Sequence, residues 1–136
     1  MKRVLGIDYG LKRTGLAISD PLGIIASPLE TIETKNLLNY ILDLNKKEKI
    51  SVLVIGLPLN LKNKLFDIEV NIKEFIQKIK TYLPEIEIER IDERFTSKIA
   101  RNFLNTYSNK QKIRRKKENL DKVSASLILQ SYLERK

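Results

Sequence analysis

The chain of 136 residues carries 26 lysines and arginines against 17 aspartates and glutamates, which gives a formal net charge of +9. It contains no cysteine and no histidine, which excludes disulfides, zinc–thiolate sites, the Ser-His-Asp triad and the commonest general base. Catalysis is therefore left to carboxylates, lysines, tyrosines and hard metal ions held by oxygen. The positive charge indicates a polyanionic partner, although lysine enrichment in an AT-rich genome would give the same sign.

The length predicts a single domain over residues 1–136. No apolar run reaches the length of a membrane span, and the amino terminus has no signal-peptide pattern. We therefore expect a soluble, cytoplasmic protein without a membrane partner. The sequence does not indicate an oligomeric state.

The first twenty residues predict a strand, a tight turn and a second strand, with the first strand ending at Asp8. Gly10 and Gly15 are expected to supply a positive φ or a close backbone approach, and Lys12 and Arg13 place two cations at the turn. Asp8 should lie near backbone amides and these cations, where it could hold a metal ion or approach a phosphate. Alternatively, it is an Asx-turn aspartate that closes the hairpin.

The rest of the chain alternates between strand and helix patterns. We expect a third strand at 23–32 that is interrupted by Pro28, a helix capped by Thr34, and a strand at 51–56 that is buried on both faces. A helix from Ile68 to Leu83, ended by Pro84, should follow, and then an edge strand at 85–91 with one solvent-exposed face. The chain should end with a helix capped by Thr96 or Ser97 that runs to Tyr107, a basic loop at 109–119 and a last helix from near Asp121.

The predicted order βββαβαβαα corresponds to an α/β fold with a mixed five-stranded sheet flanked by helices. If the first strand is central, the second strand pairs on one side of it and the fourth on the other. Ligands of open α/β sheets bind at the carboxyl ends of strands, where the chain direction switches. Asp8, residues 56–58 and the pair Asp92 and Glu93 all fall at such ends.

Four ordered segments carry a resemblance to a known family, and together they extend over essentially the whole chain: GIDYGLKRTGLAISD, IGLPLN, DERFTS and DKVSASLILQSYL. The sequence resembles the YqgF family of Holliday-junction resolvase-like or pre-16S rRNA nucleases in the ribonuclease H superfamily. The resemblance implies a ribonuclease H-like fold, a divalent-metal nuclease site and a role in maturing the 5′ end of small-subunit rRNA. It assigns the acidic site positions to Asp8, Glu93 and Asp121.

Three carboxylates from distant segments would make an oxygen-rich site suited to Mg²⁺ or Mn²⁺. Two ions roughly 4 Å apart can clamp a scissile phosphate, so no protein general base is required. We expect Asp8 to bridge the ions, with Glu93 and Asp121 completing the site and Asp92 as a weaker candidate.

Other roles remain open for two of these acids. Glu93 could instead be a solvated carboxylate paired with Arg94, and Asp121 could simply cap the last helix. The residues expected to contact nucleic acid from outside the basic loop share a position next to these acids: Lys12, Arg13, Thr14 and Arg94.

A basic stretch concentrates six cations in eight positions before the last helix: Lys110, Lys112, Arg114, Arg115, Lys116 and Lys117. We interpret it as a flap that contacts phosphates, and the alternative is a solvated loop. Because no aromatic residue is interleaved with it, the stretch would provide affinity without base stacking or sequence readout.

Four functions are compatible with these patterns. The first is a metal-dependent nuclease acting on structured RNA, and the second is a resolvase of branched, four-way DNA. The third is a nucleic-acid-binding module without catalysis. The fourth is an ATP-binding domain of the actin and sugar-kinase type, because Gly-Ile-Asp-x-Gly resembles their first phosphate loop; the chain lacks the second lobe and second phosphate loop that those proteins need.

Overall fold

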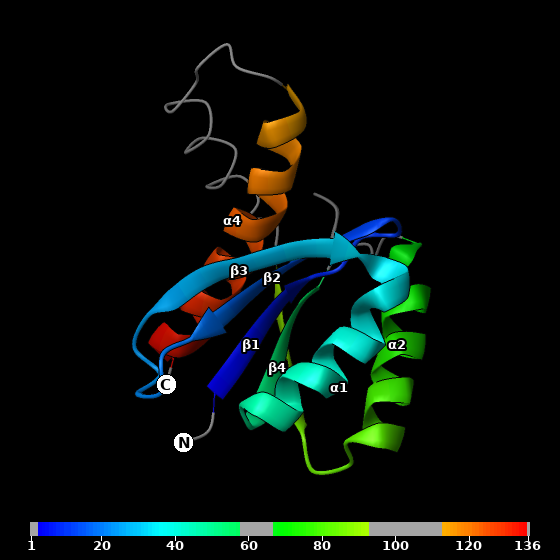
Figure 1. Ribbon diagram of the computed structural model, residues 1–136, viewed down its shortest axis with the longest axis vertical. Coiled ribbons are helices and arrows are strands. Elements are labelled where there is room, and N and C mark those ends of the chain that lie inside the picture. The colour runs from blue at the N-terminus through cyan, green and yellow to red at the C-terminus, as the bar shows by residue number, and fades with distance from the viewer. Residues whose placement is uncertain (1–2, 58–66, 93–112, 136) are drawn as a thin grey trace.

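A computed structural model describes residues 3–57, 67–92 and 113–135, with the elements coloured along the chain in Figure 1. The described strands are β1 (Arg3–Asp8), β2 (Arg13–Ser19), β3 (Ala26–Glu33), β4 (Ile50–Leu57) and β5 (Glu87–Asp92). The described helices are the 3₁₀ turn η1 (Thr34–Asn36), α1 (Leu37–Lys47), α2 (Ile68–Tyr82) and α4 (Ile113–Arg135). The helix predicted to end at Tyr107 lies outside the described residues.

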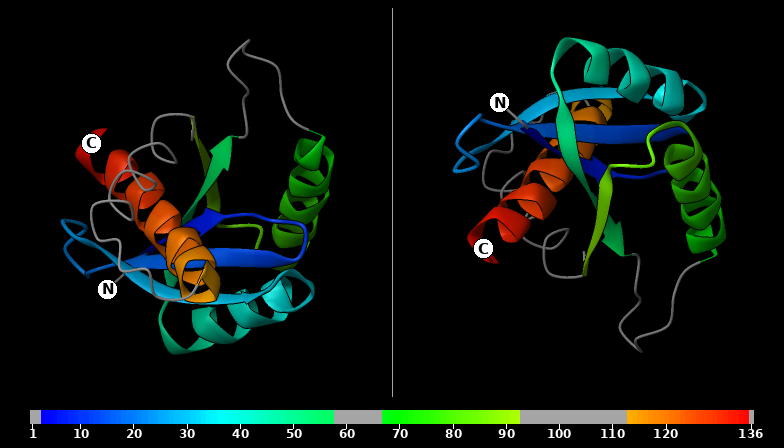
Figure 2. Two further views of the ribbon diagram at one scale, coloured as in Figure 1. Left: turned by 90° about the horizontal axis from the view of Figure 1, so that it is seen from above. Right: turned by 90° about the horizontal axis from the view of Figure 1, so that it is seen from below.

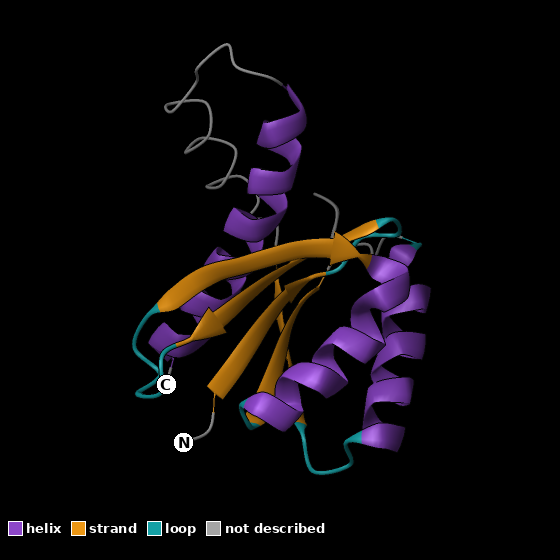
Figure 3. Cartoon of the chain, viewed as in Figure 1, coloured by secondary structure: helices purple, strands orange, loops and turns teal. Residues whose placement is uncertain are grey.

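The strands form one five-stranded sheet in the order β3-β2-β1-β4-β5 (Figure 3). The central strand β1 pairs antiparallel with β2 and parallel with β4, and β5 adds to β4 in parallel at the edge. The mixed sheet, the central first strand and the edge position of residues 87–92 are therefore confirmed.

Helices cover both faces of the sheet, and α4 lies on the face opposite α1 and α2 (Figure 2). Alternate side chains of the sheet supply the two cores, because successive strand residues point to opposite faces. The core beneath α1 and α2 contains Leu5, Ile7, Leu16, Leu53 and Ile55. The core beneath α4 contains Val4, Ala17, Val52, Val54 and Ile91.

One face of each of α1 and α2 is apolar and packs against the sheet. Leu37 and Ile41 are buried on α1, and Ile72, Phe75 and Ile79 are buried on α2. None of the described helices is long and apolar enough to span a membrane.

The predicted capping role of Thr34 is wrong, because this residue begins η1 and the residue before α1 is Asn36. The β2–β3 pairing carries Thr34 next to the β1–β2 turn, where its amide donates to the carbonyl oxygen of Lys12 at 2.9 Å. A tertiary partner thus replaces the local cap.

The basic loop predicted up to residue 119 is also wrong from Ile113 onward, because α4 begins there rather than near Asp121. Residues 113–120 contain neither glycine nor proline, and lysine, arginine and glutamate are good helix formers. The charged residues of this segment therefore do not prevent it from forming a helix. Further along α4, the side chains buried against the sheet are Ser124, Ala125, Ile128, Leu129, Tyr132 and Leu133.

Two glycines allow α4 to lie directly on the sheet backbone. A Cβ atom on Gly6 would lie 2.7 Å from the Leu129 Cβ and 2.8 Å from the Ala125 carbonyl oxygen. A Cβ atom on Gly15 would overlap the carbonyl group of Asp121. The close approach predicted for Gly15 is therefore confirmed, whereas its positive φ is not.

The third strand begins at Ala26 rather than at residue 23, because the preceding residues form a turn closed by Asp20. The Asp20 Oδ1 accepts hydrogen bonds from the amides of Ile24 at 2.7 Å and Ile25 at 2.9 Å, and Gly23 has a φ of 71°. Pro28 is accommodated because β3 is an edge strand whose pairing with β2 is irregular near Ala17.

The end of β5 does not have the solvent-exposed face that the alternation of apolar and polar residues predicts. Ile91 packs in the α4 core, and on the other face Arg90 forms a partly buried ion pair with Glu69 of α2. The Arg90 guanidinium binds both Glu69 oxygens, at 2.9 and 2.6 Å, and also donates to the carbonyl oxygens of Ile55 and Gly56. This clamp joins β4, β5 and α2 close to the carboxyl ends of the strands.

Candidate functional site

The fold brings Asp8 and Asp121 together although they are far apart in sequence. Asp8 ends β1 and lies opposite Gly15 of β2 in the antiparallel register. By strand alternation Asp8 belongs to the same face as Gly6, which is the face covered by α4. Asp121 of α4 lies over Gly15, with its Cβ only 3.0 Å from the position that a Gly15 Cβ would take.

These positions place the two side chains on the same face of the sheet and near each other. Directly opposite residues of an antiparallel pair have Cβ atoms about 5 Å apart, so the Cβ atoms of Asp8 and Asp121 start within roughly 8 Å of each other. Both residues are partly exposed. A hard cation between them would be reached by carboxylate oxygens, the donor type that Mg²⁺ and Mn²⁺ prefer.

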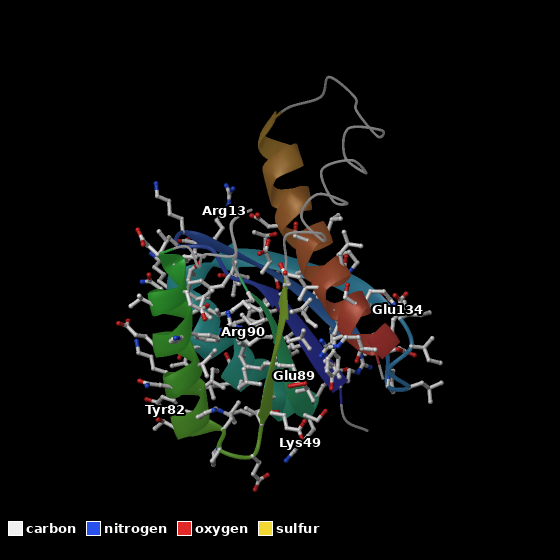
Figure 4. All side chains as sticks on the ribbon, turned by 180° about the vertical axis from the view of Figure 1, so that it is seen from behind. Arg13, Lys49, Tyr82, Glu89, Arg90 and Glu134 are labelled. Carbon is white, nitrogen blue, oxygen red and sulfur yellow. The ribbon has the colours of Figure 1, made fainter. Side chains whose placement is uncertain are left out.

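Arg13 of β2, which is labelled in Figure 4, forms an ion pair with the Asp121 carboxylate. The distance between the Arg13 Nε and the Asp121 Oδ2 is 3.4 Å, and 44% of the Arg13 side chain is exposed. Asp121 lies well inside α4, so the alternative interpretation as a helix cap is wrong. Arg13 thus presents a cation to solvent next to an acidic pair.

Asp92 is not brought onto this face. It ends β5, pairs with Leu57 of β4, and is separated from β1 by the whole width of β4, about 10 Å. Because Ile91 faces α4, alternation assigns Asp92 to the opposite face. Glu93 and Arg94 lie outside the described residues, and within the part that the structure describes no three acidic side chains form a metal-binding cluster.

Thr14 is not brought to the acidic pair either. It is fully buried on the α1–α2 side, and its hydroxyl lies 2.8 Å from that of Thr34. The Thr34 hydroxyl donates to the Gly10 carbonyl oxygen at 2.6 Å, so Thr14 is the donor to Thr34. This chain of hydrogen bonds fixes the β1–β2 turn, which carries Lys12 and Arg13.

Replacing Thr34 with valine should destabilise the protein by about 1 to 2 kcal/mol, because the buried Thr14 hydroxyl and the Gly10 carbonyl both lose a partner. Chemical denaturation measures this loss. The control is Thr81→Val, which removes an exposed hydroxyl bonded only to the Gln77 carbonyl of its own helix, and should cost about 0.5 kcal/mol or less. Equal losses in the two variants would contradict the role of Thr34 in the turn.

A hollow of about 850 Å³ lies between the β1–β2 turn and α4, and it is lined by Gly10, Leu11, Lys12, Arg13, Glu33, Lys35 and Asp121. We call it the turn hollow. Its cations are Lys12, Arg13 and Lys35. Sequence analysis missed Lys35, because only the β2–β3 pairing carries it next to the turn.

Another hollow, of about 610 Å³, is lined by residues such as Lys49 and Tyr82. Figure 4 shows these two residues at the end of the sheet away from Arg13. This hollow lies at the amino ends of the parallel strands, so it is not part of the candidate site.

The architecture defines the class of protein as ribonuclease H-like. Two solved structures of this type align over nearly the whole chain. RuvC of T. thermophilus, in complex with a Holliday junction substrate, has a TM-score of 0.57 and 13% identity, and covers 99% of this chain and 96% of its own. The fowlpox virus resolvase, in complex with Holliday junction DNA, has a TM-score of 0.56 and 17% identity, and covers 98% of this chain and 97% of its own.

The chain belongs to the RuvX family, described as Holliday junction resolvase, whose model matches residues 2–135. A relative from Amoebophilus asiaticus is 47% identical over 133 residues, which is 98% of this chain and 94% of the relative. A relative from Bacteroides fragilis is 43% identical over 136 residues, which is 100% of this chain and 99% of the relative. Both are named as a pre-16S rRNA nuclease. The resemblance to the YqgF family and the ribonuclease H-like fold are confirmed.

Proposed function

We propose that this chain is a divalent-metal-dependent nuclease that hydrolyses phosphodiester bonds during maturation of the 5′ end of pre-16S rRNA. One observation carries the proposal. Asp8 pairs with Gly15, Asp121 packs over Gly15, and a hollow lined by cations lies beside them. The family description supports phosphodiester hydrolysis, and the names of the close relatives support the substrate. Family membership also favours a nuclease over the ATP-binding alternative.

In this proposal Asp8 and Asp121 hold Mg²⁺ or Mn²⁺, with Glu93 as the third acidic ligand and Asp92 outside the set. When bound, the metal would activate a water and stabilise the leaving oxygen, so the reaction would not depend on a histidine general base, which the chain lacks. Asp8 is the last residue of the central strand β1, and Asp121 lies within α4 and pairs with Arg13. Both proposed ligands are therefore positioned on rigid elements.

The cations of the turn hollow would bind the phosphates that flank the scissile bond. Lys12 and Arg13 lie at the turn that Thr34 fixes, and Lys35 of η1 lines the same hollow. Arg13 can offer its exposed guanidinium nitrogens to a phosphate while its Nε remains near Asp121. The cations therefore guide the substrate strand towards the acidic pair.

The basic stretch would extend this binding surface. Arg114 to Lys117 belong to the first turns of α4, which project beyond the sheet in Figure 1. Lys110, Lys112 and Arg94 lie outside the described residues and stay predicted contacts. A helical run that continues into Asp121 couples phosphate binding to the position of the acidic ligand.

A nuclease assay tests the proposal. Purified wild-type protein should cleave precursor 16S rRNA with Mg²⁺ or Mn²⁺ and not with EDTA, and Asp8→Asn should not cleave. Four-way DNA junctions and single strands belong in the same assay, because the family description and both solved resolvase complexes favour a junction resolvase as the second candidate. Metal-independent binding without cleavage of any substrate would instead indicate a non-catalytic binding module.

Replacing the six cations Lys110, Lys112, Arg114, Arg115, Lys116 and Lys117 with serine or glutamine should weaken binding about equally for all nucleic-acid sequences. The slope of log affinity against log salt should become shallower by up to roughly one unit per lost phosphate contact. The control replaces the exposed Lys46 and Lys47 at the end of α1, away from the turn hollow, and should leave the slope unchanged. An unchanged slope in the six-fold variant would show that the run is only solvated.

A further inference from the structure

A third hollow, of about 380 Å³, lies on the other side of the β1–β2 turn, on the face covered by α1 and α2. Its lining includes the polar and aromatic side chains of Tyr9, Lys35, Asn39, Asn71, Glu74 and Lys78. Leu11 and Lys35 line this hollow as well as the turn hollow, so the two are neighbours across the turn. We call this third hollow the amide hollow. Its volume is in the range of sites for small ligands.

The floor of the amide hollow is aromatic. Tyr9 directly follows Asp8, and it packs against Phe75 of α2 with ring centroids 5.8 Å apart and an angle of 38° between the rings. Tyr9 is only partly buried, so part of its ring faces the hollow.

The walls of the amide hollow carry paired donors and acceptors. Asn71, Glu74 and Lys78 follow a helical spacing along one face of α2, and Asn39 approaches from α1. All four are exposed. Two amides and a carboxylate above an aromatic ring are the groups that recognise the edge and face of an unpaired nucleobase.

On the basis of the proposed nuclease function, we propose that the amide hollow binds one unpaired base of the substrate, next to the phosphates held in the turn hollow. The Asn39 and Asn71 amides and the Glu74 carboxylate can pair with the edge of a base, and Lys35 and Lys78 can contact the phosphates that adjoin it. Lys35 lines both hollows and would contact the backbone where the strand crosses the turn. The enzyme should then require a single-stranded nucleotide at one position near the cut.

Binding in EDTA tests this inference without cleavage. A short fluorescein-labelled single-stranded RNA is titrated with wild type, Asn71→Ala and Asn39→Ala, and anisotropy gives each Kd. Each variant should bind about five-fold more weakly, the loss typical of one hydrogen bond. The control is Gln77→Ala, which removes an exposed amide from the same helix outside the hollow and should leave the Kd unchanged.

An abasic nucleotide moved along the RNA identifies the bound base. At one position it should weaken wild-type binding by roughly ten-fold, because stacking on Tyr9 is lost with the base. At that position Asn71→Ala should add little further loss, whereas at other positions the two losses should multiply. Multiplying losses at every position, or unchanged Kd values for both asparagine variants, would overturn the inference.

The outcome is separable from that of the proposed function. If wild type cleaves with Mn²⁺ while both asparagine variants bind like wild type, the amide hollow fails and the nuclease proposal stands. If wild type cleaves no substrate but the abasic position couples to Asn71, the nuclease proposal fails and the base-binding hollow stands.

Discussion

In EDTA, Asp8→Asn should be as stable as wild type or more stable, by on the order of 1 kcal/mol. Asp8 lies opposite Gly15, and the Asp121 Cβ lies over Gly15, so the two carboxylates project from neighbouring positions. Removing one negative charge while keeping the side-chain shape therefore relieves repulsion. Thermal melting with and without EDTA measures the effect.

Mg²⁺ or Mn²⁺ should raise the melting temperature of wild type, because a ligand that binds only the native state stabilises it by about 2.7 kcal/mol at a hundred-fold excess over Kd. Asp8→Asn should lose most of this response together with cleavage. The control is Asp43→Asn on the exposed side of α1, which should keep both. If Asp8 only closed the turn, Asp8→Asn would be destabilised and would keep a normal metal response. That outcome would contradict the metal site.

Gly15→Ala should destabilise the protein by about 2 to 3 kcal/mol and abolish cleavage. The added Cβ would overlap the carbonyl group of Asp121, so α4 must move away from β2. That movement weakens the core beneath α4 and separates Asp121 from Asp8. Chemical denaturation and the metal-induced shift in melting temperature measure the two consequences independently.

The matched control for this substitution is Gly23→Ala. Gly23 has a φ of 71° and no neighbour within 4 Å of an added Cβ, so alanine meets backbone strain of about 1 kcal/mol but no steric clash. It lies in the β2–β3 turn, so cleavage and the metal response should persist. If Gly15→Ala matched wild type in both measurements, α4 would not rest on Gly15.

Local patterns in the sequence determined much of the fold. The apolar stripe of α2, the fully apolar run of β4 and the strand–turn–strand at the start each reflect a short-range periodicity that needs no distant partner to be recognised. The absence of histidine and cysteine likewise restricts the chemistry, because it removes the commonest general base and all thiolate ligands. Asp8 could be chosen because it ends a central strand.

Only the tertiary structure decided which residues meet. Gly15 lets α4 approach the sheet closely enough to bring Asp121 beside Asp8, and the β2–β3 pairing adds Lys35 to the turn hollow. Thr14 was expected to contact a phosphate, but its position in β2 directs its side chain to the face covered by α1 and α2, where it is buried. Such contacts depend on face, register and helix packing between distant segments, and a shift of one residue along a strand reverses the face, so local sequence cannot specify them.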